Sequence, residues 1–100
     1  MNRDIYSIDE IKSVLSPVFD KYKVKKAVLF GSYAKGNAKL SSDIDLLVDS
    51  GLRGLAFVGL MEEIRCSVDK EIDVFDVSHI TPSSKISSEI ARDGVVIYGE

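Results

Sequence analysis

The sequence predicts a single α/β domain with a mixed β-sheet flanked by helices, and three observations support this fold class. The chain has 100 residues, of which 45% are hydrophobic and 29% charged, as expected of one folded domain of ordinary size. Short runs of aliphatic and β-branched residues alternate with longer segments of helical hydrophobic spacing. No internal repeat, low-complexity tract or linker interrupts the chain, so we expect residues 1–100 to form one domain.

The first predicted element is an amphipathic helix that starts after Ser7. Ser7 and Glu10 have the spacing of a capping box, in which each side chain accepts a hydrogen bond from a free backbone N–H. Apolar residues recur at helical spacing from Ile8 to Tyr22 and fall on one stripe. Pro17 lies on the polar side of this stripe, where we expect it to kink the helix or to divide it.

Four short runs predict the strands of the sheet. Residues 26–30 and 44–48 are expected to be central strands, and residues 46–48 are apolar enough to be covered on both faces. Residues 71–75 and 95–98 predict a third and a fourth strand. The first two strands are joined by a loop of about ten residues, which allows antiparallel or parallel pairing and leaves this choice open.

Two further helices are predicted between the strands. Apolar residues cover most of the helix circumference between residues 51 and 69, so this helix is expected to be covered on more than one side. Its broad apolar surface over residues 52–61 suggests contact with a partner subunit or with a second copy of the chain. Thr81 and Pro82 offer a cap and a first-turn proline for a last helix that Gly94 can close.

Charge and cysteine content argue against several classes of protein. The net charge of −3 and the isoelectric point near 5.1 disfavour a general nucleic-acid-binding protein, which needs a basic surface. The single cysteine, Cys66, has no partner for an internal disulfide or a zinc site, which favours a reducing, cytoplasmic setting. No run approaches the roughly 20 apolar residues that a membrane-spanning helix needs.

Two aspartates lie in the apolar run of the second strand. Side chains alternate between the two faces of a strand, so Asp43 and Asp45 point the same way. Taken alone, such a pair more often marks a solvated strand or turn. On a largely apolar element, however, their mutual repulsion and desolvation predict a bound divalent cation, and oxygen ligands suit Mg²⁺ completed by substrate phosphates.

A glycine-bounded turn precedes this strand and has the features of a phosphate-binding loop. Gly31 ends the first strand, Ser32 can cap a short helical turn, and Gly36 can close that turn in the left-handed conformation. A phosphate can approach the backbone closely at Gly31, while Ser32 adds a hydroxyl and Lys35 a positive charge. We therefore expect Gly31, Ser32 and Lys35 to bind the phosphates of a nucleotide.

Phosphoryl transfer with two metal ions usually uses a further carboxylate, and the third predicted strand offers one. Asp73 is flanked by Ile72 and Val74, a core-like position where an aspartate needs a functional reason. Asp69 and Asp76 are alternatives, but they lie at the ends of this run, where solvated caps are ordinary. Asp73 is therefore the preferred third metal ligand and the preferred base for an acceptor hydroxyl.

Together these residues resemble the signature of the nucleotidyltransferase superfamily related to the palm of DNA polymerase β. That signature is Gly-Ser, a spacer of about ten residues, Asp-x-Asp and a third Asp on a later strand, as in Gly31-Ser32, Asp43-Ile44-Asp45 and Asp73. Over residues 24–98 the chain most resembles the minimal nucleotidyltransferase (MNT) proteins, which consist of the catalytic domain alone. The resemblance implies a polymerase β palm-like fold and Mg²⁺ held by Asp43, Asp45 and Asp73.

The resemblance also implies a reaction and a partner. MNT proteins transfer a nucleotide, usually AMP from ATP, and many act as antitoxins that modify a tyrosine of a helical HEPN-type toxin. Lys35 departs from the pattern because many relatives have Arg there, which can grip a phosphate through two hydrogen bonds. A second interpretation is a non-catalytic antitoxin that neutralises its partner by direct contact, although three retained aspartates count against it.

Overall fold

Four strands form one mixed sheet in the order β3-β2-β1-β4 in the computed structural model, which describes residues 6–99. Strand β1 pairs antiparallel with both β2 and β4, whereas β2 pairs parallel with β3. The predicted α/β fold with a mixed sheet is confirmed, and the first two strands are antiparallel. The strands are β1 (Lys26–Phe30), β2 (Ile44–Asp49), β3 (Ile72–Asp76) and β4 (Val95–Tyr98).

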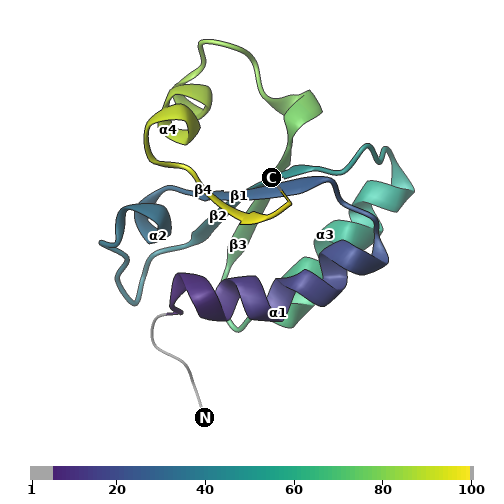
Figure 1. Cartoon of the computed structure of the whole chain (residues 1–100), viewed down its shortest axis with the longest axis horizontal. Coiled ribbons are helices and arrows are strands. Elements are labelled where there is room, and N and C mark those ends of the chain that lie inside the picture. The colour runs from purple at the N-terminus through teal and green to yellow at the C-terminus, as the bar shows by residue number, and fades with distance from the viewer. Residues whose placement is uncertain (1–5, 100) are drawn as a thin grey trace.

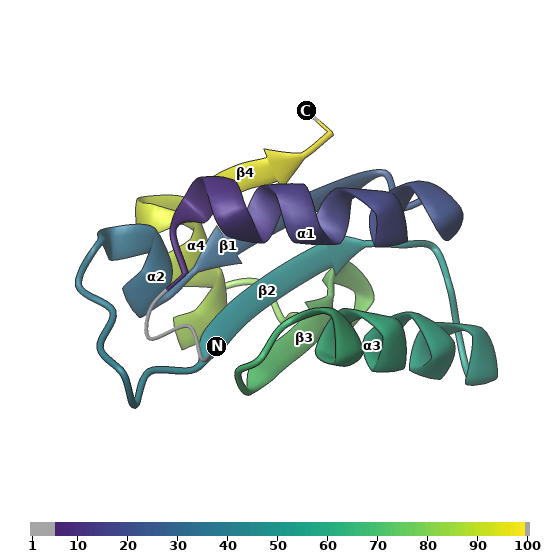
Figure 2. The same cartoon turned by 90° about the horizontal axis from the view of Figure 1, so that it is seen from below.

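The helices cover the two faces of this sheet unequally (Figure 1). On one face α1 (Ile8–Lys21) and α3 (Leu55–Ser67) lie side by side, as Figure 2 shows from below. On the other face α4 (Lys85–Asp93) lies over β1, and the short 3₁₀ helix η1 (Val77–His79) follows β3. The short helix α2 (Ser32–Lys35) connects β1 to the loop before β2.

The larger part of the hydrophobic core lies between the sheet and the pair α1 and α3. Its fully buried side chains come from both helices and from all four strands, and include Ile11, Leu15, Phe19, Leu29, Leu46, Leu60, Ile64, Ile72 and Ile97. A smaller cluster under α4 contains Val28, Phe30 and Leu47, with Ile86 and Ile90 packed against it. No residue of α4 is fully buried, so α4 is the more lightly packed layer.

Helix α1 confirms the predicted capping box but not the predicted break. The Ser7 hydroxyl accepts from the Glu10 N–H at 3.0 Å, and the Glu10 carboxylate accepts from the Ser7 N–H at 2.8 Å. Pro17 lies inside one continuous helix, so of the two expected effects, a kink or a division, the division is wrong. Pro17 is exposed, so water can solvate the carbonyl that it leaves unbonded, while buried residues on the opposite side hold the helix to the core.

Helix α3 begins later than its hydrophobic pattern suggested, because Gly54 occupies the N-cap with φ of +58°. Phe57, Leu60 and Ile64 are buried in the core, whereas Leu55 is 89% and Val58 46% exposed. The apolar surface left at the start of α3 is therefore small, and contact with a partner there stays a prediction. Among residues 6–99 no helix is both long and apolar enough to cross a bilayer.

Helix α4 begins at Lys85 rather than directly after Thr81, which corrects the predicted cap. Ser84 is the N-cap, and its side chain accepts a hydrogen bond from the Ser87 N–H at 3.1 Å. Ser83 has φ of +68°, a left-handed conformation that a helix does not continue through. A serine that follows this turn is therefore the first residue able to cap the helix.

Candidate active site

The register of β2 and β3 places two of the three predicted carboxylates side by side. Asp45 is paired with Asp73 across the parallel strands, at the usual strand separation of about 4.8 Å. Asp45 shares its sheet face with Leu47, which packs under α4, so both carboxylates lie on the α4 side. Asp43 immediately precedes β2 and is two residues from Asp45.

Gly31 closes the site from the end of β1, and its lack of a side chain is required there. Its φ is +75°, in the region that favours glycine. A Cβ atom at this position would lie 2.3 Å from Oδ2 of Asp45, which is closer than such atoms can approach. The backbone of the predicted phosphate loop and the predicted metal ligand are therefore in direct contact.

The environment of Asp45 disfavours its ionised form. Burial, followed by the charges of Asp73, Asp43 and Glu89, raises the pKa of Asp45 from 3.8 to about 6. Asp73 and Asp43 are thus close enough to Asp45 for their charges to act on it. This concentration of negative charge is what a bound cation would neutralise.

The donor atoms fit a hard divalent cation, although the carboxylates do not already surround a common point. Within residues 6–99 no three His, Cys, Asp or Glu side chains are gathered as ready metal ligands. Asp43 and Asp73 are exposed and Asp45 is half-buried, so the outer two side chains are free to turn toward an ion. The core-like position expected for Asp73 is wrong, because β3 is an edge strand of the sheet.

Helix α2 holds the other predicted residues beside Asp45. Tyr33 anchors this turn because its side chain is buried in the main core. Gly36 ends it in the left-handed conformation, as predicted, with φ of +80°. Ser32 is the first residue of the helix, however, and Gly31 takes the N-cap position that the sequence suggested for Ser32.

Lys35 lies at the far end of α2, where it reaches α4. Its Nζ atom is 4.0 Å from Oδ2 of Asp93, and one turn earlier on α4 Glu89 adds its charge to the field at Asp45. Neither acidic residue was predicted to belong to the site. Carboxylates four residues apart on an amphipathic helix are typical of a solvated face. Only the position of α4 in the fold shows that these two lie near the site.

Asp76, one of the two alternatives to Asp73, has a structural role. It is only 2% exposed and accepts hydrogen bonds from the N–H and hydroxyl of both Ser50 and Ser78, at 2.6 to 3.1 Å. Burial alone would raise the pKa of Asp76, but these hydrogen bonds outweigh it and lower the pKa. Asp76 does cap η1, yet the expectation of a solvated cap is wrong, and its side chain points away from Asp45.

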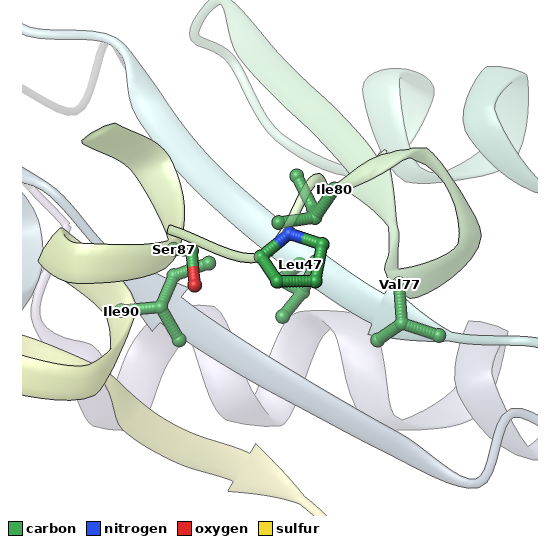
Figure 3. Close-up of a pocket in the computed structure, with 6 residues that line it drawn as sticks. Leu47, Val77, Ile80, Ser87 and Ile90 are labelled. Carbon is green, nitrogen blue, oxygen red and sulfur yellow. The ribbon is translucent and has the colours of Figure 1, made fainter. Parts of the chain in front are cut away.

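A cavity of about 250 Å³ lies on the same sheet face between α4 and η1 (Figure 3). Its lining is almost entirely apolar and consists of Leu47, Val77, Ile80, Pro82, Ser87 and Ile90. The rings of Phe30 and Phe75 contact each other across β2, with centroids 5.9 Å apart. Because Phe30 is paired with Asp45 and Phe75 with Leu47, this aromatic pair separates the cavity from the carboxylates.

A mixed sheet that carries paired aspartates beside a Gly-Ser turn defines a protein of the nucleotidyltransferase class. Comparison with known families agrees, because residues 11–100 match the family described as polymerase beta, nucleotidyltransferase. The chain belongs to this family, and its interpretation as an MNT domain with a polymerase β-like fold is confirmed.

Similar proteins are named as adenylyltransferases. The chain is 41% identical to a Methanocaldococcus jannaschii protein named as an inferred protein adenylyltransferase. The alignment of 81 residues covers 79% of this chain and 87% of that protein. It is 30% identical over 113 aligned positions to the protein adenylyltransferase MntA of Aphanizomenon flos-aquae, covering 100% of this chain and 74% of that protein. The MntA of Thermococcus cleftensis is 29% identical over 99 positions, which cover 91% of this chain and 96% of that protein.

Solved structures share the fold at lower identity. A chain of a toxin-antitoxin complex with AMP-PNP has a TM-score of 0.74 at 22% identity, covering 89% of this chain and 73% of that one. A chain from the complex of a tri-AMPylated HEPN toxin of Shewanella oneidensis with its MNT antitoxin has a TM-score of 0.69 at 18% identity, covering 93% and 73%. These likenesses establish the fold of the chain.

Proposed function

We propose that this chain transfers AMP from ATP to a tyrosine hydroxyl of a HEPN-type helical protein and thereby acts as an antitoxin. The observation that carries this function is the pairing of Asp45 with Asp73, with Gly31 in contact with the Asp45 carboxylate. It is supported by relatives named protein adenylyltransferase and by similar chains in toxin-antitoxin complexes.

Each predicted residue has a defined task in this reaction. Asp43, Asp45 and Asp73 would hold Mg²⁺, which when bound activates the acceptor oxygen and offsets the negative charge of the phosphates. Gly31 leaves room for a phosphate beside the backbone. The Ser32 hydroxyl and the Lys35 ammonium group bind the phosphates on the α2 side.

In the chemical step one bond forms, one bond breaks and one proton is transferred. The acceptor oxygen attacks the α-phosphorus of ATP, the bond to the β-phosphate breaks, and pyrophosphate leaves. The proton of the acceptor hydroxyl passes to Asp73, whose exposure on the edge strand allows a protein side chain to reach it.

The test measures the intact mass of the partner. The chain is co-expressed with a HEPN-type protein from the same genome, and the purified proteins are incubated with ATP and Mg²⁺. We expect the partner to gain mass in whole AMP units, and a Tyr→Phe change at the modified position to abolish the gain. Absence of any AMP addition in the presence of Mg²⁺ and ATP would refute the proposed function.

A matched pair of variants separates catalysis from contact. The double variant Asp43→Asn with Asp45→Asn should bind the partner but neither modify nor neutralise it. Asp49→Asn is the control, because Asp49 lies on the same face of β2 at its other end, opposite Lys26.

One observation favours a non-catalytic antitoxin, namely that the carboxylates do not already surround a common point. Neutralisation by the double variant would establish that alternative.

A further inference from the structure

We propose that Arg92 of α4 is a second phosphate-binding residue and that the Asp93 carboxylate occupies its phosphate position until a nucleotide binds. In this arrangement Arg92 and Lys35 together hold the outer phosphates of the triphosphate. This role rests on the proposed function, because it assigns α4 to the same nucleotide site.

Two cations converge on a single oxygen atom of Asp93. Nε of Arg92 donates to Oδ2 of Asp93 at 2.8 Å, and Nζ of Lys35 lies 4.0 Å from the same atom. The distance between the two nitrogen atoms therefore cannot exceed the sum of these two distances. A phosphate accepts charge-assisted hydrogen bonds of about 2.7–2.9 Å on several oxygens, so one phosphate can bridge two cations at this separation.

The position of this pair suits the outer phosphates. Gly31 at the start of α2 touches Asp45, where the α-phosphate would react, and Lys35 is the last residue of the same helix. Four helical residues rise about 6 Å, a length comparable with that of a triphosphate. A nucleotide with its α-phosphate at Asp45 can therefore extend along α2 toward Lys35 and Arg92.

Asp93 is the least exposed of the three charged side chains. The Asp93 side chain is 23% exposed, compared with 39% for Lys35 and 62% for Arg92. Exposed ion pairs of this kind are weak, so a phosphate with higher charge and more acceptor atoms can displace the carboxylate. Arg92 stays charged throughout, because the hydrogen bond and charge of Asp93, together with Glu89, raise its pKa further.

The stability of α4 does not explain why an aspartate occupies position 93. It is the last residue of α4, where a negative charge interacts unfavourably with the helix dipole. Its contact with Lys35 links α4 to α2, which are far apart in the sequence. A carboxylate that occupies the phosphate position accounts for both observations.

Calorimetric titration of the full chain tests this assignment with three probes, namely ATP with Mg²⁺, inorganic tripolyphosphate and AMP. Arg92→Ala should weaken binding of ATP and tripolyphosphate by about five- to twentyfold, the loss of a charge-assisted contact, and leave AMP unchanged. Asp93→Asn should strengthen binding of the two polyphosphates by about two- to fivefold, because it removes the competing carboxylate. Thermal unfolding of each variant verifies that it is folded.

Arg65→Ala is the matched control for the loss of one positive charge. Arg65 is an exposed residue of α3, which covers the opposite face of the sheet (Figure 1). Equal affinities of Arg92→Ala and Arg65→Ala for tripolyphosphate would overturn the assignment of Arg92. Weaker binding by Asp93→Asn would show that Asp93 positions Lys35 instead of competing with phosphate. Normal polyphosphate binding with no transfer to the partner would refute only the proposed function.

Discussion

Replacing Gly31 with alanine should damage catalysis much more than folding. The added Cβ would lie 2.3 Å from Oδ2 of Asp45, whereas real Cβ contacts essentially never fall below 3.0 Å. The Asp45 carboxylate has to turn aside to relieve this contact, because the backbone at Gly31 is fixed between β1 and α2. Alanine at φ of +75° and ψ of −153°, a region almost restricted to glycine, adds about 1–3 kcal/mol of backbone strain.

Gly54→Ala isolates the backbone strain from the contact with Asp45. Gly54, the N-cap of α3, has φ of +58° and ψ of −132°, close to the +75° and −153° of Gly31, but an added Cβ there meets no atom within 4 Å. Both variants should therefore lose about 1–3 kcal/mol of unfolding free energy from strain alone. A displacement of about 1 Å in a catalytic group can cost about a hundredfold in rate, so we expect that loss in Gly31→Ala only.

Two measurements on the same preparations check this expectation. Urea titration gives the unfolding free energy, and the time course of AMP addition to the partner gives the rate for the folded protein. If Gly31→Ala keeps more than about a tenth of the rate of Gly54→Ala, the position of the Asp45 carboxylate does not limit the reaction. The reasoning about the contact between Gly31 and Asp45 would then be wrong.

The remaining predictions concern the buried hydrogen bonds of Asp76. Asp76→Asn should lower the free energy of unfolding by about 2–4 kcal/mol, because an amide cannot accept from all four donors of Ser50 and Ser78. Urea titration measures this loss, and a change below about 1 kcal/mol would contradict it. The second prediction is a pH dependence: since folding lowers the pKa of Asp76, its contribution is present above the unfolded value of about 3.9 and is lost as pH falls through the folded value. Below about pH 4 the wild type should therefore lose more stability than Asp76→Asn, and parallel losses in urea titrations at several pH values would refute this role.

Local sequence patterns determined the helices, the strands and the two motifs of the site. The capping box at Ser7, the alternation around Asp45 and the turn from Gly31 to Gly36 each depend on residues a few positions apart. Backbone and side-chain preferences act over the same short range, so such features can be recognised without knowledge of the fold. Where local signals competed, as at the start of α4, the pattern misplaced the boundary by a few residues.

The tertiary structure alone decided which distant residues meet. It paired Asp45 with Asp73 and buried Asp76 where it accepts hydrogen bonds from Ser50 and Ser78. It also brought Arg92 and Asp93 of α4 close to Lys35. These contacts depend on strand register and on the packing of α4 over β1, which are set by the hydrophobic burial of whole elements. The sequence by itself therefore determined the family and its Gly-Ser and Asp-x-Asp motifs, whereas the burial and charge around each carboxylate arose only when separate segments packed together.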